Sequence, residues 1–310
     1  MLQYLIILLD DTSTSFCHYQ NNKAEKKMMS VDTLRQAIRF AMTENLMIQF
    51  VYPDFEIPEE IKKEIDTIDH VNIKPLYDES TDVFAANSWN LRNLPRDIPV
   101  VLRTSKTELF EKYTLLKDVL GNAQRLNIVI TDIDSFSDED FQKYNKVLTE
   151  LTKYVEAIYL KGKSPQLNIL TDRMMLKSMN NCGAGETAVT LAPNGKFYVC
   201  PAFYFDDEQN SIGELEKGLD IKNKQLYVLD HAPICRICDA WQCKRCVWLN
   251  QKTTLEVNTP GHEQCVIAHL ERNASKTLLD NIRKHGTFLP EFDEIKEINY
   301  LDPFDKINEL

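Results

Sequence analysis

The segment CRICDAWQCKRC, Cys235–Cys246, contains four of the eight cysteines in a chain of 310 residues. Three further cysteines, Cys182, Cys200 and Cys265, lie on either side of it. A pair of cysteines separated by two residues lets two sulfurs bind one metal centre from a tight turn, while nearby backbone N–H groups donate to the sulfurs. The spacing therefore predicts that this part of the chain binds metal, with an unmetallated or disulfide role as the alternative.

Seven thiolates exceed what one tetrahedral zinc ion or one four-cysteine iron–sulfur cluster takes, so two sites are the simplest arrangement. Thiolate ligation favours zinc or iron–sulfur, and the spacing alone does not separate the two. A small segment of turns and short strands has little hydrophobic core. Bound metal would therefore supply much of its stability.

The composition is that of a globular protein, because hydrophobic residues make up 43% and charged residues 27% of the chain. The net charge of -11 argues against unaided binding to nucleic acid or to an anionic membrane, since phosphate contacts need clustered Lys and Arg. The start, MLQYLIILLDD, is too short to cross a bilayer and lacks the basic flank and cleavage site of a signal peptide. We interpret it as a buried strand of a cytoplasmic protein, in which thiols stay reduced.

Residues 1–173 alternate short apolar runs with amphipathic segments, which is typical of βα units around a parallel sheet. Several runs are continuously aliphatic or β-branched, as in strands that are buried on both faces. Strands are predicted at residues 4–9, 46–51, 70–73, 82–86, 98–103, 126–131 and 167–171.

Helices are predicted between these strands from helical spacing of apolar residues and from capping signals. One follows Ser30, and a second surrounds Pro58. Ser105 begins a third that ends near Gly121, and Ser137 precedes a fourth, whose apolar face includes Phe141, Tyr144, Leu148, Leu151 and Val155. Another helix is predicted from residue 266 to residue 285.

The ordered cysteines resemble those of a known family. Together with Gly195, five positions before Cys200, they are similar to the seven-cysteine SPASM domain that follows the barrel in many radical SAM peptide-modifying enzymes. The family pattern is C…G-x4-C…C-x2-C-x5-C-x3-C…C, and the segments CGAG and SIGEL also stand where family members have similar ones. Two gaps in this chain, x4 and x2, are each one residue shorter than in the family. The resemblance covers about residues 175–270.

This resemblance implies an α/β fold with three parts. Residues 1–173 would form a partial (β/α)6 TIM-like barrel of radical SAM type, and residues 174–270 a small cysteine-rich SPASM-like iron–sulfur domain. Residues 271–310 would form a C-terminal helix and an acidic tail.

The same resemblance implies two [4Fe–4S] clusters. One would be held by Cys235, Cys238, Cys243 and Cys265, and the other by Cys182, Cys200 and Cys246. The last iron of the second cluster would be open to a peptide thiolate or bound by another residue such as His231 or His262. For either histidine, a surface or core position is the ordinary interpretation.

A working radical SAM barrel carries C-x3-C-x2-C in the loop after its first strand, and those thiolates hold the cluster that binds S-adenosylmethionine. Here the loop reads DDTSTSFCHYQNN, residues 10–22, and has Cys17 alone. After the second strand, the family's glycine-rich GGE turn is replaced by FVYPDFEIP, residues 50–58, with no glycine to let a ligand approach the backbone. S-adenosylmethionine is therefore not expected as a cofactor. Cys17, with His18 and Tyr19, is a buried loop residue by default or else a metal or partner contact.

A degenerate barrel that keeps its SPASM cysteines resembles the CXXX-repeat peptide maturase group. The resemblance implies an auxiliary, non-catalytic subunit, in a heterodimer with a radical SAM peptide maturase that modifies a ribosomally made cysteine-repeat precursor peptide. A zinc-binding scaffold with structural cysteines is one alternative, and an enzyme that cleaves S-adenosylmethionine through unrecognised ligands is another. Four carboxylates near strand ends would contact a basic leader peptide or the partner, or else serve as turn and cap residues: Asp10, Asp11, Asp132 and Asp134.

Overall fold

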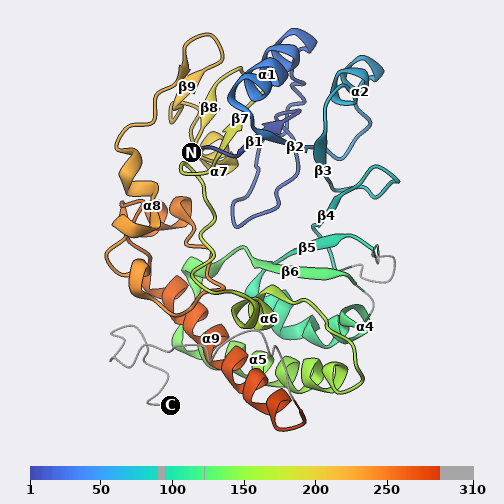
Figure 1. Ribbon diagram of the computed structural model, residues 1–310, viewed down its shortest axis with the longest axis vertical. Coiled ribbons are helices and arrows are strands. Elements are labelled where there is room, and N and C mark those ends of the chain that lie inside the picture. Colours follow the sequence, from blue (N-terminus) through green and yellow to red (C-terminus); the bar gives the residue numbers. More distant parts are fainter. Residues whose placement is uncertain (90–94, 96, 122, 287–310) are drawn as a thin grey trace. The chain divides into compact units, whose positions relative to one another are not determined.

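The computed structural model of the chain describes residues 1–89, 95, 97–121 and 123–286 (Figure 1). The chain divides into two compact units. Unit 1 consists of Met1–Ala86 and Gly183–His231, and unit 2 of Asn87–Cys182 and Ala232–Leu310. None of the helices within the described ranges is both long enough and apolar enough to pass through a lipid bilayer.

Unit 1 is built on a sheet with the strand order β4-β3-β2-β1-β7-β8. The neighbours from β4 to β7 run parallel, and β8 runs antiparallel to β7. In the centre of the sheet, Tyr4 lies opposite Met47 on one side and Ala188 on the other. The strands are β1 (Tyr4–Leu8), β2 (Met47–Val51), β3 (His70–Lys74), β4 (Val83–Ala86), β7 (Ala188–Leu191) and β8 (Phe197–Tyr198).

Helices α1 (Val31–Glu44) and α2 (Glu59–Ile65) pack on the sheet of unit 1 and close its core (Figure 1). Helix α1 begins where the hydroxyl of Ser30 accepts from the N–H of Thr33, which satisfies a donor that the first turn leaves unpaired. The later part of unit 1 contains α7 (Pro201–Asp206), the hairpin β9 (Gly213–Glu214) with β10 (Gly218–Leu219), and the 3-10 helices Lys224–Tyr227 and Leu229–His231.

Unit 2 contains two parallel strands, β5 (Pro99–Thr104) and β6 (Arg125–Ile130), which pair in register along their whole length. Its long helices α5 and α9 pack against each other, and α9 also packs on α6 (Figure 1). The helices are α3 (Lys106–Lys112), α4 (Leu116–Leu120), α5 (Asp138–Tyr159), α6 (Asn168–Met175), α8 (Val247–Thr254) and α9 (His262–Arg283).

The structure confirms six of the seven predicted strands and the predicted helix starts at Ser30, Ser105 and Ser137. At Ser137 both halves of a capping box form, because the Asp140 side chain also accepts from the Ser137 N–H. The helix predicted from Ser105 to Gly121 is interrupted by a 3-10 turn at Tyr113–Leu115. The helix predicted at residues 266–285 begins earlier, at His262. The predicted acidic tail lies outside the described residues from 287 onward, and the predicted three-part division stays a prediction.

The seventh predicted strand, residues 167–171, is wrong, because α6 begins there. The side chain of Asn168 takes the place that a strand backbone would have beside β6. Its Oδ1 accepts from the Ile128 N–H at 2.8 Å, and its Nδ2 donates to the Ile128 carbonyl at 2.9 Å. Only Leu167 forms a β-bridge, to Leu126, and Thr171 Oγ1 then accepts from the Leu167 N–H at 2.9 Å as the helix starts. An asparagine side chain carries the same donor and acceptor as a peptide group, so it can end the sheet without leaving β6 unpaired.

We therefore expect Asn168→Ala to destabilise the chain by about 1–3 kcal/mol, because it leaves the N–H and C=O of Ile128 without their partners. Chemical denaturation followed by circular dichroism measures the change. Asn145→Ala, on the exposed face of α5, is the matched control and should stay within about 0.5 kcal/mol of the parent. Equal effects of the two substitutions would contradict this role of Asn168.

Candidate metal centre

The cysteine-rich segment of unit 2 is held by a buried ion network around Asp239. This carboxylate accepts from Arg272 Nη1 at 3.0 Å and lies 3.5 Å from Arg173 Nη2. Arg173 also donates from Nε to the Asp239 carbonyl oxygen at 3.0 Å. Because Arg173 belongs to α6 and Arg272 to α9, the network ties the segment to both helices.

The segment itself is a run of tight turns. A 3-10 helix spans Cys235–Ile237, and the Cys243 N–H then donates to the Ala240 carbonyl at 3.0 Å. Residues 180–182 run beside it, because the Asn180 N–H donates to the Trp241 carbonyl at 2.8 Å and the Cys182 N–H to the Lys244 carbonyl at 2.9 Å. The cysteines are thereby brought together by backbone turns and by helix α9, since the segment has few apolar residues to bury.

Four thiols line one cavity of about 300 Å³ in unit 2: Cys235, Cys238, Cys243 and Cys265. The remaining wall is mainly aliphatic, with Met179, Ile234, Ile237, Pro260 and Ala268. These four are the cysteines that the family resemblance assigns to one cluster. The structure brings them to one cavity, and their role as ligands stays a prediction.

Backbone donors surround the sulfurs. The Ala240 N–H donates to Cys238 Sγ at 3.4 Å, and the Arg245 N–H donates to Cys243 Sγ at 3.4 Å. The Nε2 atom of His269 lies 3.5 Å from Cys238 Sγ. Such donors stabilise the negative charge of thiolates and are a usual feature of iron–sulfur sites.

Burial raises the pKa of the Cys235 thiol to about 11 and that of the Cys243 thiol to about 12. The charges of neighbouring cysteines raise both values further, while Arg245 acts in the opposite direction on each, through its charge at Cys235 and its N–H at Cys243. These thiols therefore bind protons at neutral pH unless a cation stabilises the thiolates. Metal binding would release those protons, as at other thiolate sites.

The donor set and the walls of the cavity fit an iron–sulfur cluster. Four sulfurs, N–H donors aimed at two of them and apolar surroundings are what a four-cysteine cluster requires. All eight cysteines lie in the described ranges and are thiols, not disulfides. Across those ranges, no three His, Cys, Asp or Glu side chains are gathered as ligands of a single metal ion.

The three cysteines predicted for a second cluster are divided between the units. Cys182 and Cys246 belong to unit 2, where the Cys182 sulfur lies 4.0 Å from the Arg245 carbonyl oxygen and Cys246 precedes α8. Cys200 belongs to unit 1, where it precedes α7. Its position after β8 depends on the predicted turn at Gly195, whose φ of 76° is one that a glycine adopts without strain. This second ligand set stays a prediction.

The candidate histidines His231 and His262 are not among the residues that line the cavity, and their predicted role at the second cluster stays a prediction. His231 is exposed at the end of unit 1, and the His262 ring packs 6.3 Å from the ring of Phe141. Among the described residues that line the cavity, the histidine is His269, which sequence reasoning missed. A signal was present, because His269 follows Cys265 by four residues and so shares its face of α9.

Two of the four candidate carboxylates are turn and cap residues. Asp10 Oδ1 accepts from the N–H and the hydroxyl of Thr12 at 2.8 and 2.6 Å, and Asp132 accepts from the Lys106 N–H at 2.8 Å at the start of α3. Asp134 pairs with Lys252 at 2.6 Å in unit 2. Asp11 accepts from the hydroxyl of Tyr204 in unit 1; burial raises the pKa of that phenol, and this hydrogen bond raises it further.

The loop after β1, which carries Cys17, is fastened to unit 1 by its own side chains. Asn21 Nδ2 donates to the carbonyl oxygens of Asp11 and Ser13, both at 2.9 Å. Ser13 Oγ donates to the Val51 carbonyl at the end of β2 at 2.9 Å. Cys17 itself is exposed, which corrects the expectation that it is buried.

Tyr19 anchors the same loop to α7. It is 2% exposed and stacks on Phe205 with ring centroids 5.5 Å apart. Lys23 forms an ion pair with Glu208 and lies over the ring of Tyr204, 3.9 Å from its centroid. Residues from both halves of the loop therefore hold it against unit 1.

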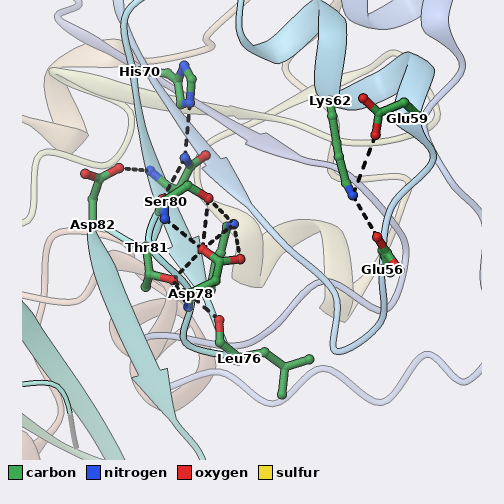
Figure 2. A network of polar contacts seen from close by, with 11 residues as sticks. Glu56, Glu59, Lys62, His70, Leu76, Asp78, Ser80, Thr81 and Asp82 are labelled. Carbon is green, nitrogen blue, oxygen red and sulfur yellow. Dashed lines mark hydrogen bonds and ion pairs between the residues drawn. The ribbon is translucent and has the colours of Figure 1, made fainter.

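Side chains also occupy the carboxyl ends of β2 and β3. The Tyr52 carbonyl accepts from the Thr14 N–H at 2.9 Å, and Lys74 Nζ lies 4.6 Å from the centroid of the Tyr52 ring. Lys74 also bonds Asp78 at 2.8 Å and Ser80 at 2.6 Å. Figure 2 shows the Asp78 carboxylate between Ser80 and Thr81 in this network, and Lys62 between Glu56 and Glu59 nearby.

No protein-family model and no curated protein match the chain. Solved structures do match it. Native anSMEcpe with bound AdoMet and Cp18Cys peptide has a TM-score of 0.60 at 12% identity, over 92% of this chain and 100% of that chain. The same protein with AdoMet and Kp18Cys peptide has a TM-score of 0.60 at 13% identity, over 91% of this chain and 99% of that chain. With AdoMet alone it has a TM-score of 0.58 at 13% identity, over 91% of this chain and 100% of that chain.

The chain is therefore a mixed α/β protein with parallel strands and a radical SAM-like fold of the TIM-barrel type, as predicted. At 12–13% identity the likeness shows the fold alone. One fold serves many activities, so the function of the chain depends on its site residues, which here are the cavity and the packed loop.

Glu271 on α9 contacts the cysteine segment, and its burial makes the stability of the chain depend on pH. It accepts from the Tyr144 hydroxyl at 2.8 Å and from Gln242 Nε2 at 3.4 Å. Burial raises the pKa of this carboxyl to about 7, although both hydrogen bonds lower it. Since the pKa is higher in the folded chain than in the unfolded chain, the folded state binds more protons between about pH 4.5 and 7, and this contribution to stability falls as the pH rises.

We expect Glu271→Gln, which is neutral at every pH, to weaken that fall in stability. Urea denaturation of the parent and the variant at several pH values between about 4.5 and 7 measures it. Glu139→Gln, on the exposed face of α5, is the control and should leave the pH dependence as it is in the parent. Parallel curves for Glu271→Gln and the parent would show that the carboxyl does not titrate in this range.

Proposed function

We propose that this chain is an auxiliary iron–sulfur subunit of a radical SAM peptide maturase complex, in which it serves the modification of a ribosomally made cysteine-repeat precursor peptide. One contrast within the chain carries the proposal. Four thiols line an apolar cavity in unit 2, whereas the loop after β1 offers a single, exposed cysteine.

The cavity is where a cluster would be held, by Cys235, Cys238, Cys243 and Cys265. When bound, a [4Fe–4S] cluster supplies one-electron transfer. The protein residues would hold and tune it, because Ala240 and Arg245 donate N–H bonds to two of the sulfurs and mainly aliphatic side chains line the rest of the wall.

The packing of unit 1 supports a chain that does not itself cleave S-adenosylmethionine. In α/β folds with parallel strands, ligands bind at the carboxyl ends of the strands. Here the loop after β1 is bonded to β2 through Ser13, and Lys74 and Tyr52 occupy the ends of β3 and β2. A single thiol at Cys17 is too few to hold a catalytic cluster. The chemistry would then be started on a partner, the radical SAM peptide maturase.

The remaining cysteines, Cys182, Cys200 and Cys246, would hold a second [4Fe–4S] cluster. Three cysteines leave one iron for a further ligand, and a thiolate of the precursor peptide has the chemistry to bind there. In the matching anSMEcpe structures the bound Cp18Cys and Kp18Cys are peptides, so a peptide is a reasonable substrate class for a chain of this fold.

Metal and sulfide analysis of protein purified without oxygen tests the cluster. We expect iron and acid-labile sulfide in amounts near two [4Fe–4S] clusters per chain. Cys243→Ser should lose roughly half of both, because it removes one ligand of one cluster. Cys17→Ser, an exposed cysteine outside the site, is the control and should keep the parent content. Colourless protein with zinc and no sulfide would establish the scaffold alternative instead.

Co-expression with the radical SAM peptide maturase that the proposal requires as a partner tests the auxiliary role. We expect the two proteins to co-purify and the modification of the precursor peptide to be lost when this chain is deleted. The isolated chain, reduced in the presence of S-adenosylmethionine, should form no 5′-deoxyadenosine. Full modification without this chain, together with no co-purification, would refute the proposal, and 5′-deoxyadenosine from the chain alone would make it an enzyme.

A further inference from the structure

Three buried or partly buried arginines surround the cysteine segment, and two of them share one acidic partner. Arg173 and Arg272 both face the carboxylate of Asp239. The third, Arg245, lines the cysteine cavity, and its Nε donates to the side chain of Asn181 at 3.0 Å.

Arg245 is fully buried, with 0% of its surface exposed. It also has a φ of 46°, which is uncommon for a residue with a side chain and persists only where the surroundings impose it. The imposed conformation turns the Arg245 N–H toward Cys243 Sγ at 3.4 Å. Arg245 thus lines the cavity and also donates its backbone N–H to one of the four sulfurs.

Arg245 is a buried cation in the wall of the cavity that the four sulfurs line, and its N–H contacts one of these sulfurs, Cys243 Sγ. Interactions of such a cation with nearby charges are strong, because a fully buried charge is screened by water much less than an exposed one. The field of this cation acts on any negative charge that is added inside the cavity.

A [4Fe–4S] cluster held by four thiolates is an anion, and reduction adds one electron to it. No bond forms or breaks in that step, and the electron comes from a low-potential one-electron donor such as a reduced iron–sulfur or flavin protein. A buried cation beside the cluster stabilises the reduced state more than the oxidised state, because the reduced state carries more negative charge.

We propose that Arg245 is the positioning residue that sets the reduction potential of the cluster at Cys235, Cys238, Cys243 and Cys265, by raising it through its buried charge and its N–H bond to Cys243. This inference rests on the proposed function only in requiring that cluster. It deepens the function by naming the group that makes the site an electron acceptor within the complex.

The chain offers a matched control in the same segment. Arg236 is exposed and lies between Cys235 and Ile237, so its charge is screened by solvent. Arg245→Gln removes the buried charge, Arg245→Lys keeps it, and Arg236→Gln removes an exposed one. Asn181→Asp leaves Arg245 in place but sets a carboxylate against its guanidinium, which neutralises its field without emptying the site.

The experiment is a redox titration with dithionite, followed by electron paramagnetic resonance, on the anaerobically purified full chain. Cys243→Ser identifies the signal, because it loses this cluster. We expect the midpoint potential of that signal to become more negative in Arg245→Gln and in Asn181→Asp, and to stay near the parent in Arg245→Lys and Arg236→Gln.

Arg245→Gln or Asn181→Asp protein with the iron and sulfide content of the parent and an unchanged potential would overturn the role of Arg245. If Arg245→Gln does not assemble the cluster, Asn181→Asp decides alone, because it keeps the arginine. Absence of iron and sulfide from the parent protein would instead refute the proposed function, so the two failures are distinguishable.

Discussion

The ion network at Asp239 is the constraint on which the candidate site depends. A carboxylate buried to 4% exposure is costly unless its charge is matched, and Arg173 and Arg272 match it from two helices. The turns between Cys235 and Cys246 have little apolar surface of their own to bury. Their position is therefore determined by this network, which places the segment against α6 and α9 before any metal is bound. Helix α9 then contributes Cys265 and His269 from its own face.

The two units illustrate how one fold accommodates different chemistry. The chain shares its fold with anSMEcpe, whose solved structures contain AdoMet. In unit 1 the loop after β1 is filled by Tyr19 stacked on Phe205 and by polar bonds from Asn21 and Ser13, so its own side chains satisfy one another. In unit 2 the cavity presents sulfurs that burial keeps protonated until a cation binds. The loop of unit 1 and the cavity of unit 2 therefore differ in what their side chains can bind, and one fold can carry either kind of site.

Local signals predicted most of the secondary structure. Continuous apolar runs marked β1 to β6, and hydroxyl caps at Ser30, Ser105 and Ser137 marked helix starts, because these features act over a few residues. The same signals gave a wrong prediction for residues 167–171. Their apolar pattern suits a strand as well as a helix, and the outcome depended on Asn168 meeting Ile128, forty positions away in the chain.

The sequence by itself determined the spacing of the cysteines and the chemistry that thiols can support, because both are properties of the chain before it folds. It also determined that a single cysteine, Cys17, follows the first strand. Only the tertiary structure decided which groups surround the four sulfurs. His269 comes from α9, and the Asp239 network joins the cysteine segment to Arg173 and Arg272, which lie far from it in the chain. Arg245 belongs to the segment itself, but only the fold buries it. Burial gives these groups their strength, because a charge or a donor acts strongly only where folding has removed the water.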